Sequence, residues 1–478
     1  MKKTGLFKII MFILLGIVVV TWIFSASFYT EGNLSDLGMY SVGFFDFFSL
    51  LFGSFEFTYF LQIFILLVSI GALYGVLGKT GKYRAWVEKI ANKCKGTELV
   101  FLIITAFVIA AISSALDYGF SLFIFFPFII SIILAMGYDK VTAAVATFGA
   151  MLVGTIGSTL GHNTSGVIAD LLGITAKTGI TYKLALFVFA FAVLILYLSK
   201  AKRVKGAKKD EIIDPFIGEK TSNKYSIVPM IVILSLVFVF LVLGCTDWVD
   251  AFGVKVFSKF HTTVSSFSVK LPYLHITSSG FDTGSHDVTI FAKILGNYQE
   301  LGSWAYSEMS IVCLVAALLI GLFYRVKGKF EAMLEGAKKM LVPAFMVLLV
   351  YTVIFFAGNQ MFYPTIASLI LSISSKFSVV LSAICVAIGS VFHIDMLYVA
   401  NYVVPQINAV EGVNGTVLGL ITQSIYGVTM FVAPTSAMLV LGLSYLGIPY
   451  KEWIKKTWKL VVALLVVVFV ILLLAKFL

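Results

Sequence analysis

The stretch GTIGSTLGHNTSG, residues 154–166, places polar side chains and four glycines inside an otherwise apolar part of the chain. Apolar runs near 141–157 and 181–199 flank it. Polar backbone at membrane depth is tolerated only where it is buried in protein or lines a cavity. The stretch therefore predicts a broken membrane helix whose hydroxyls, amide and carbonyls bind an ion or a polar solute. The alternative is an ordinary polar loop at the membrane surface.

A second interruption, at residues 423–438, reads QSIYGVTMFVAPTSAM. Pro434 breaks the apolar helix there, and Thr435 and Ser436 stand where a new helix would begin, as capping residues. In both regions a Thr-Ser pair is followed by an apolar segment that ends in Gly-Ile. Matching interruptions in two halves of a chain indicate a binding site between two repeats. The alternative is a proline kink whose hydroxyls are satisfied locally.

The composition requires lipid as the solvent for much of the chain. Of its 478 residues, 60% are hydrophobic and 12% are charged, whereas a soluble domain has about 25% charged residues. Apolar runs near the spanning length of about 20 residues recur from 7–26 to 458–478. We predict an all-α polytopic membrane protein with about 11–13 transmembrane helices, in two inverted repeats with re-entrant hairpins.

The position of the basic residues predicts the topology. The net charge is +11, and most Lys and Arg residues fall in short segments between apolar runs. These segments are 2–8, 79–95, 200–224, 325–339 and 451–459. Basic loops are retained in the cytoplasm, so we predict a cytoplasmic N-terminus in a bacterial-type cytoplasmic membrane. The charge therefore reports topology, and we expect no nucleic-acid partner.

The same basic segments suggest how the chain is divided. The polar stretch 201–224 reads as a cytoplasmic linker between a first transmembrane half, 1–200, and a second half, 225–478. The second half carries an insertion at about 248–305, predicted to lie outside the cytoplasm. Alternating residues and Gly/Asp turn signals within this insertion predict a small β-hairpin.

Asp117, His393 and Asp395 are ionisable residues inside apolar runs. Asp170, which follows the first interruption, is a fourth ionisable residue, for which a structural role is favoured. Such residues are costly in a membrane and are functional candidates by default. Each could bind a coupling ion, carry a proton or pair with a cationic solute. The alternative for Asp117 and Asp395 is a position at a helix end near the headgroups. His393 could simply partner Asp395, although an i, i+2 spacing does not share a helix face.

Several classes of protein are disfavoured by absent motifs. The chain lacks GxxxxGK[ST], so an ATP motor of its own is not expected. It also lacks HExxH and GxSxG, and we predict that it is not an enzyme. The four cysteines are scattered, which disfavours a disulfide or metal site. We expect no cofactor beyond a coupling Na⁺ or H⁺.

Four strings resemble one carrier family: YGVLGKTGKYRAWVEKIA (74–91), MGYDKVTAAVATFGAMLVGTIGST (136–159), ILGNYQELGSWAYSEMS (294–310) and APTSAMLVLGLSYLGIPYKEWIKKTWKL (433–460). They are similar to the YfcC branch of the DcuC-like carriers in the ion transporter superfamily. The resemblance implies two inverted repeats with re-entrant hairpins. It also implies a four-carbon dicarboxylate, a basic amino acid or arginine/ornithine exchange as the transported solute.

The family's first hairpin maps onto His162, Asn163 and Thr164, and its Pro-Thr-Ser element maps onto 434–436. The chain departs from the family near both: an acidic pair is reduced to Leu116-Asp117, and SVFHIDMLY (390–398) replaces a Ser-Gly-rich stretch. These departures bear directly on which solute is carried.

We predict a secondary active transporter that works by alternating access, with ion coupling or exchange. Few embedded basic residues and two embedded acids favour a basic amino acid such as arginine or ornithine; a four-carbon dicarboxylate carrier is the alternative. A channel or a non-transporting membrane scaffold is the alternative of another class. The expected partners are the solute and the lipid bilayer, and a homodimer is left open. The predicted binding residues are Asp117, Ser158, Thr159, His162, Asn163, Thr164, Ser165, His393, Asp395, Pro434, Thr435 and Ser436.

Overall fold

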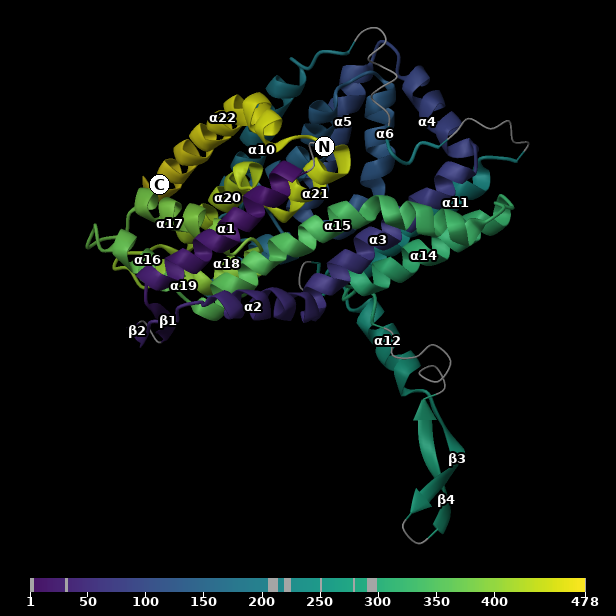
Figure 1. Cartoon of the computed structure of the whole chain (residues 1–478), viewed down its shortest axis with the longest axis horizontal. Helices are drawn as coiled ribbons and strands as arrows, with labels where there is room; N and C mark the ends of the chain where they lie inside the picture. The colour runs from purple at the N-terminus through teal and green to yellow at the C-terminus, as the bar shows by residue number, and fades with distance from the viewer. Residues whose placement is uncertain are drawn as a thin grey trace.

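The structure is a computed structural model of the chain. It describes residues 4–30, 33–204, 214–218, 225–249, 252–277, 280–289 and 299–477. Helices dominate it, and Figure 1 shows them packed into one body from which α12 (Val256–Ser266) and a β-hairpin project. In the described residues, nine helical segments are long and apolar enough to cross a membrane. This confirms the predicted polytopic all-α architecture.

The first half contains α1 (Thr4–Ile23), α2 (Phe44–Glu56), α3 (Thr58–Lys79), α4 (Lys82–Lys93), α5 (Glu98–Ala115), η1 (Gly119–Phe125), α6 (Phe126–Ala135), α7 (Lys140–Ala144), η2 (Val145–Gly149), α8 (Ala150–Ile156), η3 (His162–Gly166), α9 (Val167–Leu172) and α10 (Ile180–Leu198). The second half contains α11 (Val228–Cys245), α12, α14 (Tyr306–Phe323), α15 (Lys329–Gln360), α16 (Tyr363–Leu371), α17 (Val379–Phe392), α18 (Met396–Tyr402), α19 (Val404–Asn408), α20 (Gly415–Val432), α21 (Ala437–Leu446) and α22 (Tyr450–Phe477). Three shorter apolar segments, Gly119–Ala135, Lys140–Ile156 and Val379–Phe392, accompany the nine long ones.

Two antiparallel hairpins lie outside the helices. One pairs β1 (Ala26–Thr30) with β2 (Asn33–Gly38). The other pairs β3 (Ser268–Thr277) with β4 (Gly280–Thr289), so that Ser268 lies opposite Thr289. The second is the hairpin predicted from alternation and turn residues, and it forms the end of the projecting arm (Figure 1).

Four helices are interrupted, and the interruptions come in two matching pairs. In the first half, Leu116–Tyr118 separates α5 from η1, and Gly157–Gly161 separates α8 from η3. In the second half, the breaks are 393–395 between α17 and α18, and 433–436 between α20 and α21. Asp117 and Ser158 are separated by the same number of residues as Asp395 and Ser436. This spacing is consistent with the predicted pair of repeats.

The two halves interlock where α3 crosses α15. A Cβ on Gly75 of α3 would lie 2.2 Å from the Ala332 carbonyl oxygen, and one on Gly336 of α15 would lie 2.1 Å from the Gly71 oxygen. The two backbones therefore touch directly. Gly71 and Gly75 form a GxxxG pattern, which permits close helix approach in membranes. The pattern is visible in the sequence, but only the packing shows that α15 is the helix that α3 approaches.

The basic segments gather at one end of the body, here called the basic end. Lys79 pairs with Glu335 at 3.0 Å, and residues near the N-terminus, including Leu6, line a small cavity together with Lys451. The predicted linker reaches the same end: residues 214–218 pack against both halves. Residues 201–204 are also described, and 205–213 and 219–224 lie outside the described residues. The predicted placement of these segments on one face agrees with these contacts.

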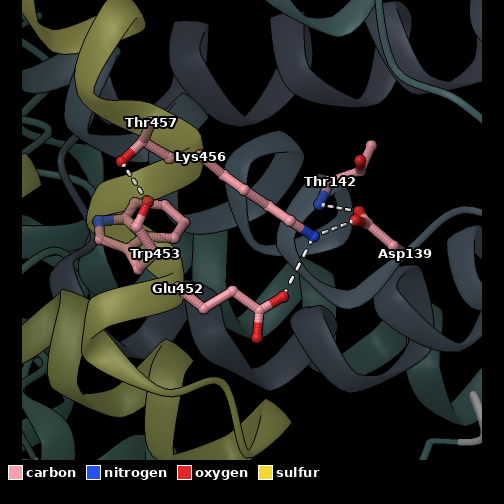
Figure 2. A network of polar contacts seen from close by, with 6 residues as sticks. All are labelled: Asp139, Thr142, Glu452, Trp453, Lys456 and Thr457. Carbon is pink, nitrogen blue, oxygen red and sulfur yellow. Dashed lines mark hydrogen bonds and ion pairs between the residues drawn. The ribbon is translucent and has the colours of Figure 1, made fainter.

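A polar network ties α22 to the turn before α7 at this end (Figure 2). Asp139 caps α7 by accepting from the Thr142 backbone N–H at 2.7 Å. Its other carboxylate oxygen accepts from Lys456 Nζ at 2.7 Å, and Lys456 also pairs with Glu452 at 3.1 Å. Burial alone would raise the pKa of Asp139, but the hydrogen bonds from Lys456 and Thr142 lower it. The cap fixes where α7 starts, and the lysine holds α22 beside it.

Candidate functional site

A cavity of about 450 Å³ lies where the four interruptions meet. It is lined from the first half by Asp117, Asn163 and Thr164, and from the second half by Asp395 and Ser436. Residues far apart in the sequence are therefore brought together at breaks in helices, where backbone groups are released from the helical ladder. Both polar stretches contain one of these interruptions, and the binding role predicted for them stays a prediction.

Asp117 is held by the first predicted stretch. It is 7% exposed, and its side chain accepts from Thr164 Oγ1 at 2.6 Å. The Asn163 side-chain amide donates to the Asp117 carbonyl at 2.7 Å. Asp117 has a left-handed backbone, with φ of 51°, which is uncommon for a residue other than glycine. The α5–η1 break and the η3 residues thus orient one carboxylate beside the cavity.

Asp395 is held by two tyrosines that the sequence analysis did not identify. One carboxylate oxygen caps α18 by accepting from the Leu397 N–H at 3.1 Å. The other accepts from the Tyr59 hydroxyl at 3.0 Å and from the Tyr351 hydroxyl at 3.4 Å. Tyr59 and Tyr351 lie on α3 and α15, outside the interruptions. Because the chain has 21 tyrosines, their presence in apolar helices gave no signal that singled them out.

Other predicted residues in the first stretch hold the break together and do not line the cavity. Thr159 donates from both its backbone N–H and its hydroxyl to the Ser114 carbonyl, at 2.8 and 3.1 Å. Ser165 donates to the Thr159 carbonyl at 3.1 Å. Gln423 of α20 donates to the Ser158 carbonyl at 3.1 Å. The Ser158 hydroxyl and the Gln423 side-chain oxygen are buried without a hydrogen-bond partner in the described part of the chain.

The Pro-Thr-Ser element behaves partly as predicted. Ser436 caps α21 by accepting from the Leu439 N–H at 3.3 Å, and it lines the cavity. Thr435 instead donates to the Val391 carbonyl at 2.9 Å, which ties the 433–436 break to α17. Pro434 lies within that break and leaves it without a helical N–H donor. One of the two expected caps is therefore formed, and the other hydroxyl joins neighbouring elements.

His393 does not partner Asp395. Its ring is 1% exposed and stacks on Tyr402, with centroids 4.9 Å apart and planes 11° apart. The Tyr363 ring lies nearly perpendicular to it, with centroids 5.6 Å apart. Both ring nitrogens lack a hydrogen-bond partner among the described residues. His393 is thus packed behind the α17–α18 break, while Asp395 faces the cavity.

A second cavity, of about 620 Å³, continues from the first. Both are lined by Tyr59, Asp117, His162, Asn163 and Tyr306. The second cavity extends to residues of the predicted insertion, among them Trp248 and Glu300. His162 Nδ1 lies 3.3 Å from a carboxylate oxygen of Asp247 at this junction. The central cavity is therefore connected toward the insertion, away from the basic end.

The charged side chains that line the central cavity are acidic in the described residues. Its described lining holds two carboxylates, Asp117 and Asp395, and no Lys or Arg. Tyrosines and phenylalanines supply much of the remaining wall, with methionines and several hydroxyls. A buried cation is stabilised by nearby carboxylates and aromatic faces. A dianion would find hydroxyl and amide donors there but no basic side chain to neutralise it.

Comparison with known proteins places these features in context. A family described as the C4-dicarboxylate anaerobic carrier matches residues 4–477. An uncharacterized protein of Haemophilus influenzae is 25% identical over 139 residues, which cover 29% of this chain and 27% of that protein. The chain thus matches about a quarter of the length of that curated relative. The crystal structure of the Alcanivorax borkumensis YdaH transporter aligns over 99% of this chain and 98% of that one, with 14% identity and a TM-score of 0.44.

Proposed function

The chain belongs to the C4-dicarboxylate anaerobic carrier family, and from this premise we propose that it is a secondary active transporter for a basic amino acid such as arginine or ornithine. The observation that carries the choice of solute is the central cavity, whose described lining has two carboxylates and no Lys or Arg. Opposite charges attract strongly where water is excluded. A cation would therefore be favoured there.

The second candidate is a four-carbon dicarboxylate, which the family's description favours. Its carboxylates would have to use hydroxyls and the first N–H groups of α21, where Ser436 and Ala437 line the cavity. They would also lie near Asp117 and Asp395, and like charges repel. The charge of the cavity therefore ranks this candidate second.

Transport in purified proteoliposomes tests both candidates. Vesicles loaded with unlabelled arginine or ornithine should take up labelled arginine by counterflow, and external succinate should not compete. Asp395→Asn and Asp117→Asn should abolish this uptake at normal protein levels. Asp170→Asn, which changes an exposed carboxylate on α9 outside the cavity lining, should leave it unchanged. Counterflow of succinate without arginine uptake would replace the first candidate by the second.

The same assay separates a carrier from a channel or a scaffold. A carrier that alternates between two states saturates with solute, and solute on the opposite side accelerates its flux. A channel shows neither saturation at low solute nor trans-acceleration, and a scaffold shows no flux. Uptake without any acceleration by internal arginine would therefore contradict alternating access.

Coupling to Na⁺ is proposed from two buried oxygens. The Ser158 hydroxyl and the Gln423 side-chain oxygen lie at the α8–η3 break without hydrogen-bond partners in the described residues. Hydroxyl and amide oxygens suit a hard monovalent cation such as Na⁺. Uptake driven by an imposed Na⁺ gradient, and reduced in Ser158→Ala, would support this ion. Uptake driven by a proton gradient alone would favour H⁺ instead.

A cytoplasmic membrane location with the N-terminus inside is proposed from the basic segments. A protease site fused ahead of residue 1 should be cut only when protease is present on the cytoplasmic side. Cleavage from outside in intact cells would reverse the proposed topology.

A further inference from the structure

Three tyrosines from three different helices surround the Asp395 end of the cavity. Tyr59 lies in the first turn of α3, Tyr306 is the first residue of α14, and Tyr351 lies in the last third of α15; all three line the cavity. The ring centroid of Tyr59 lies 6.0 Å from that of Tyr306 and 6.0 Å from that of Tyr351. Tyr59 and Tyr351 also donate to the same oxygen of Asp395. The carboxylate is therefore fixed within a group of aromatic rings.

This group combines two features that select one kind of cation. A fixed carboxylate supplies a planar pair of acceptor oxygens, and aromatic faces attract cations that are weakly hydrated. A guanidinium is planar, delocalised and weakly hydrated, whereas an ammonium is compact and strongly hydrated. The first therefore gains more from such surroundings, because less hydration is lost on binding.

We propose that Asp395 with Tyr59, Tyr306 and Tyr351 forms a guanidinium subsite that sets the preference for arginine over ornithine. The proposal rests on the proposed basic amino acid transport. It makes the three tyrosines determinants of specificity, with Tyr59 and Tyr351 also positioning the carboxylate. The Asp117 region would then hold the other end of the solute.

Two substitutions at Tyr59 separate the ring from the hydroxyl. Tyr59→Leu removes both, and the apparent KM for arginine should rise about 5- to 10-fold, with a smaller rise for ornithine. Tyr59→Phe keeps the ring and should change the arginine-to-ornithine KM ratio less. Tyr182→Leu, a half-buried tyrosine on α10 outside the cavity lining, is the matched control. If Tyr59→Leu is not inserted normally, Tyr306→Leu makes the same comparison.

The outcomes separate the subsite from the transport function. Equal losses for arginine and ornithine in the leucine variants would overturn the guanidinium subsite while leaving the transport proposal intact. Citrulline, which matches arginine in shape but lacks its charge, should compete poorly with wild-type uptake; strong competition would also overturn the subsite. If the wild-type protein carries neither cation, the transport proposal is wrong and the subsite fails with it.

A separate observation concerns the linker at the basic end. The described loop 214–218, of sequence DPFIG, is inserted into the body: Asp214 is 2% exposed and Phe216 is 1% exposed. The Tyr445 hydroxyl of α21 donates to Asp214 Oδ2 at 2.6 Å. The Phe216 ring stacks on the Tyr445 ring, with centroids 6.1 Å apart. A charged, polar linker would not be expected to bury two side chains unless they hold a specific position.

The loop is also held by α15 and α3. Lys339 Nζ of α15 donates to the Pro215 carbonyl at 2.8 Å and lies 5.4 Å from the Phe216 ring centroid. Gly218 has φ of 66°, and a Cβ there would lie 2.1 Å from the Gly78 oxygen of α3. Only glycine fits this contact, because its conformation is left-handed and the two backbones touch. The loop therefore bridges α3, α15 and α21.

Aromatic rings fill the space between this loop and the interior. Tyr445 contacts Phe123 of η1, with ring centroids 5.5 Å apart, and Phe123 contacts Phe148 of η2 at 5.8 Å. The central cavity instead continues toward the insertion at the other end. In the part of the chain that the structure describes, the central cavity thus continues toward the insertion, and packed aromatic side chains lie between it and the basic end.

We propose that loop 214–218 is a latch that closes the basic end and must detach for that end to open. Alternating access requires the closed end to open in another state, and a loop that bridges three helices opposes their separation. Burial raises the pKa of Asp214 to about 6, against hydrogen bonds from Tyr445, the Phe216 N–H and Ser131. Inserting the loop therefore disfavours the ionised form of Asp214. At neutral pH, this lowers the stability of the state in which the loop is inserted.

A cysteine placed beneath the loop can measure detachment of the loop through its labelling rate. This measurement does not require a known solute. The variant is Ser131→Cys in a chain that lacks the four native cysteines; Ser131 is 0% exposed and faces Asp214. The thiol should react slowly with a maleimide supplied at the basic end. Phe216→Ala should speed the reaction about tenfold, because the labelling rate follows local opening. Lys202→Cys, exposed in the same linker, should react rapidly with or without Phe216→Ala.

A reaction rate at residue 131 that Phe216→Ala leaves unchanged would overturn the latch. Thr352→Cys, buried in α15 at 0% exposure, must stay unreactive in the Phe216→Ala background. If the cysteine at residue 352 reacts, Phe216→Ala has unfolded the body, and Lys339→Met then replaces Phe216→Ala as the test of the latch. This change removes the donor to Pro215 at an exposed position and should also speed labelling at residue 131. No change in that variant would likewise overturn the proposal.

Discussion

The ion pair between Asp139 and Lys456 should couple α22 to the turn before α7, and a double-mutant cycle can measure it (Figure 2). Asp139→Asn removes the charge but keeps an oxygen that can accept from the Thr142 N–H. Lys456→Met removes the ammonium and keeps the aliphatic stem. Asp139→Ala removes the cap as well as the charge. The three variants therefore separate the cap of α7 from the ion pair.

The expected magnitudes follow from exposure and geometry. The side chains of Lys456 and Asp139 are 40% and 30% exposed, so solvent screens their attraction and the coupling energy should be about 0.5–1 kcal/mol. Losing an N-cap costs about 1 kcal/mol more. Asp139→Ala should therefore be roughly twice as destabilising as Asp139→Asn. High salt should reduce the coupling but not the cap contribution.

Thermal unfolding of the purified protein in detergent provides the assay. The double variant should be less destabilised than the sum of the single variants, by about 1–2 °C in Tm. Lys455→Met, at the exposed neighbouring position, controls for the loss of a positive charge. Additive effects of Asp139→Asn and Lys456→Met, or equal losses for Asp139→Asn and Asp139→Ala, would refute the reasoning.

The pH dependence of this network has a defined sign. The pKa of Asp139 is lowered in the folded protein by Lys456 and Thr142, against the effect of burial. A group with a depressed folded pKa stabilises the fold above its unfolded pKa, and that stabilisation is lost as pH falls through the folded value. The Asp139 contribution should therefore persist at neutral pH and disappear below the ordinary aspartate range, about pH 3.9.

Two further predictions test the helix contact and the first carboxylate. Gly75→Ala should sharply reduce the folded protein recovered from membranes, because its Cβ would lie 2.2 Å from the Ala332 oxygen. Gly16→Ala on α1 is the control and should not reduce recovery, because nothing lies within 4 Å of its added Cβ. Equal recovery of the two variants would contradict the direct backbone contact. Thr164→Val removes the hydroxyl that donates to Asp117 and should lower initial uptake about tenfold, as expected for a lost hydrogen bond to a charged group. Thr164→Ser retains a donor and should recover most uptake. If Thr164→Ser takes up no more solute than Thr164→Val, the hydrogen bond to Asp117 is unimportant for transport.

Local signals were enough to locate the interruptions. Glycines and polar residues in 154–166, and Pro434 in the second stretch, cannot continue an apolar helix without freeing backbone groups. The acids Asp117 and Asp395 stand out for the same reason, because an ionisable residue in an apolar run needs partners. The predicted roles of single hydroxyls were less secure: Ser436 caps its helix as expected, while Thr435 reaches across to Val391.

The sequence by itself determined that this protein is a polytopic helical membrane protein with interruptions in both halves, since hydropathy, glycine, proline and charge act through local backbone physics. Only the tertiary structure decided which tyrosines hold Asp395, because Tyr59 and Tyr351 reach it from α3 and α15. It also decided that His393 is packed away from Asp395 and that loop 214–218 is buried between α3, α15 and α21. These features depend on how distant helices pack, and no pattern within a single segment encodes them.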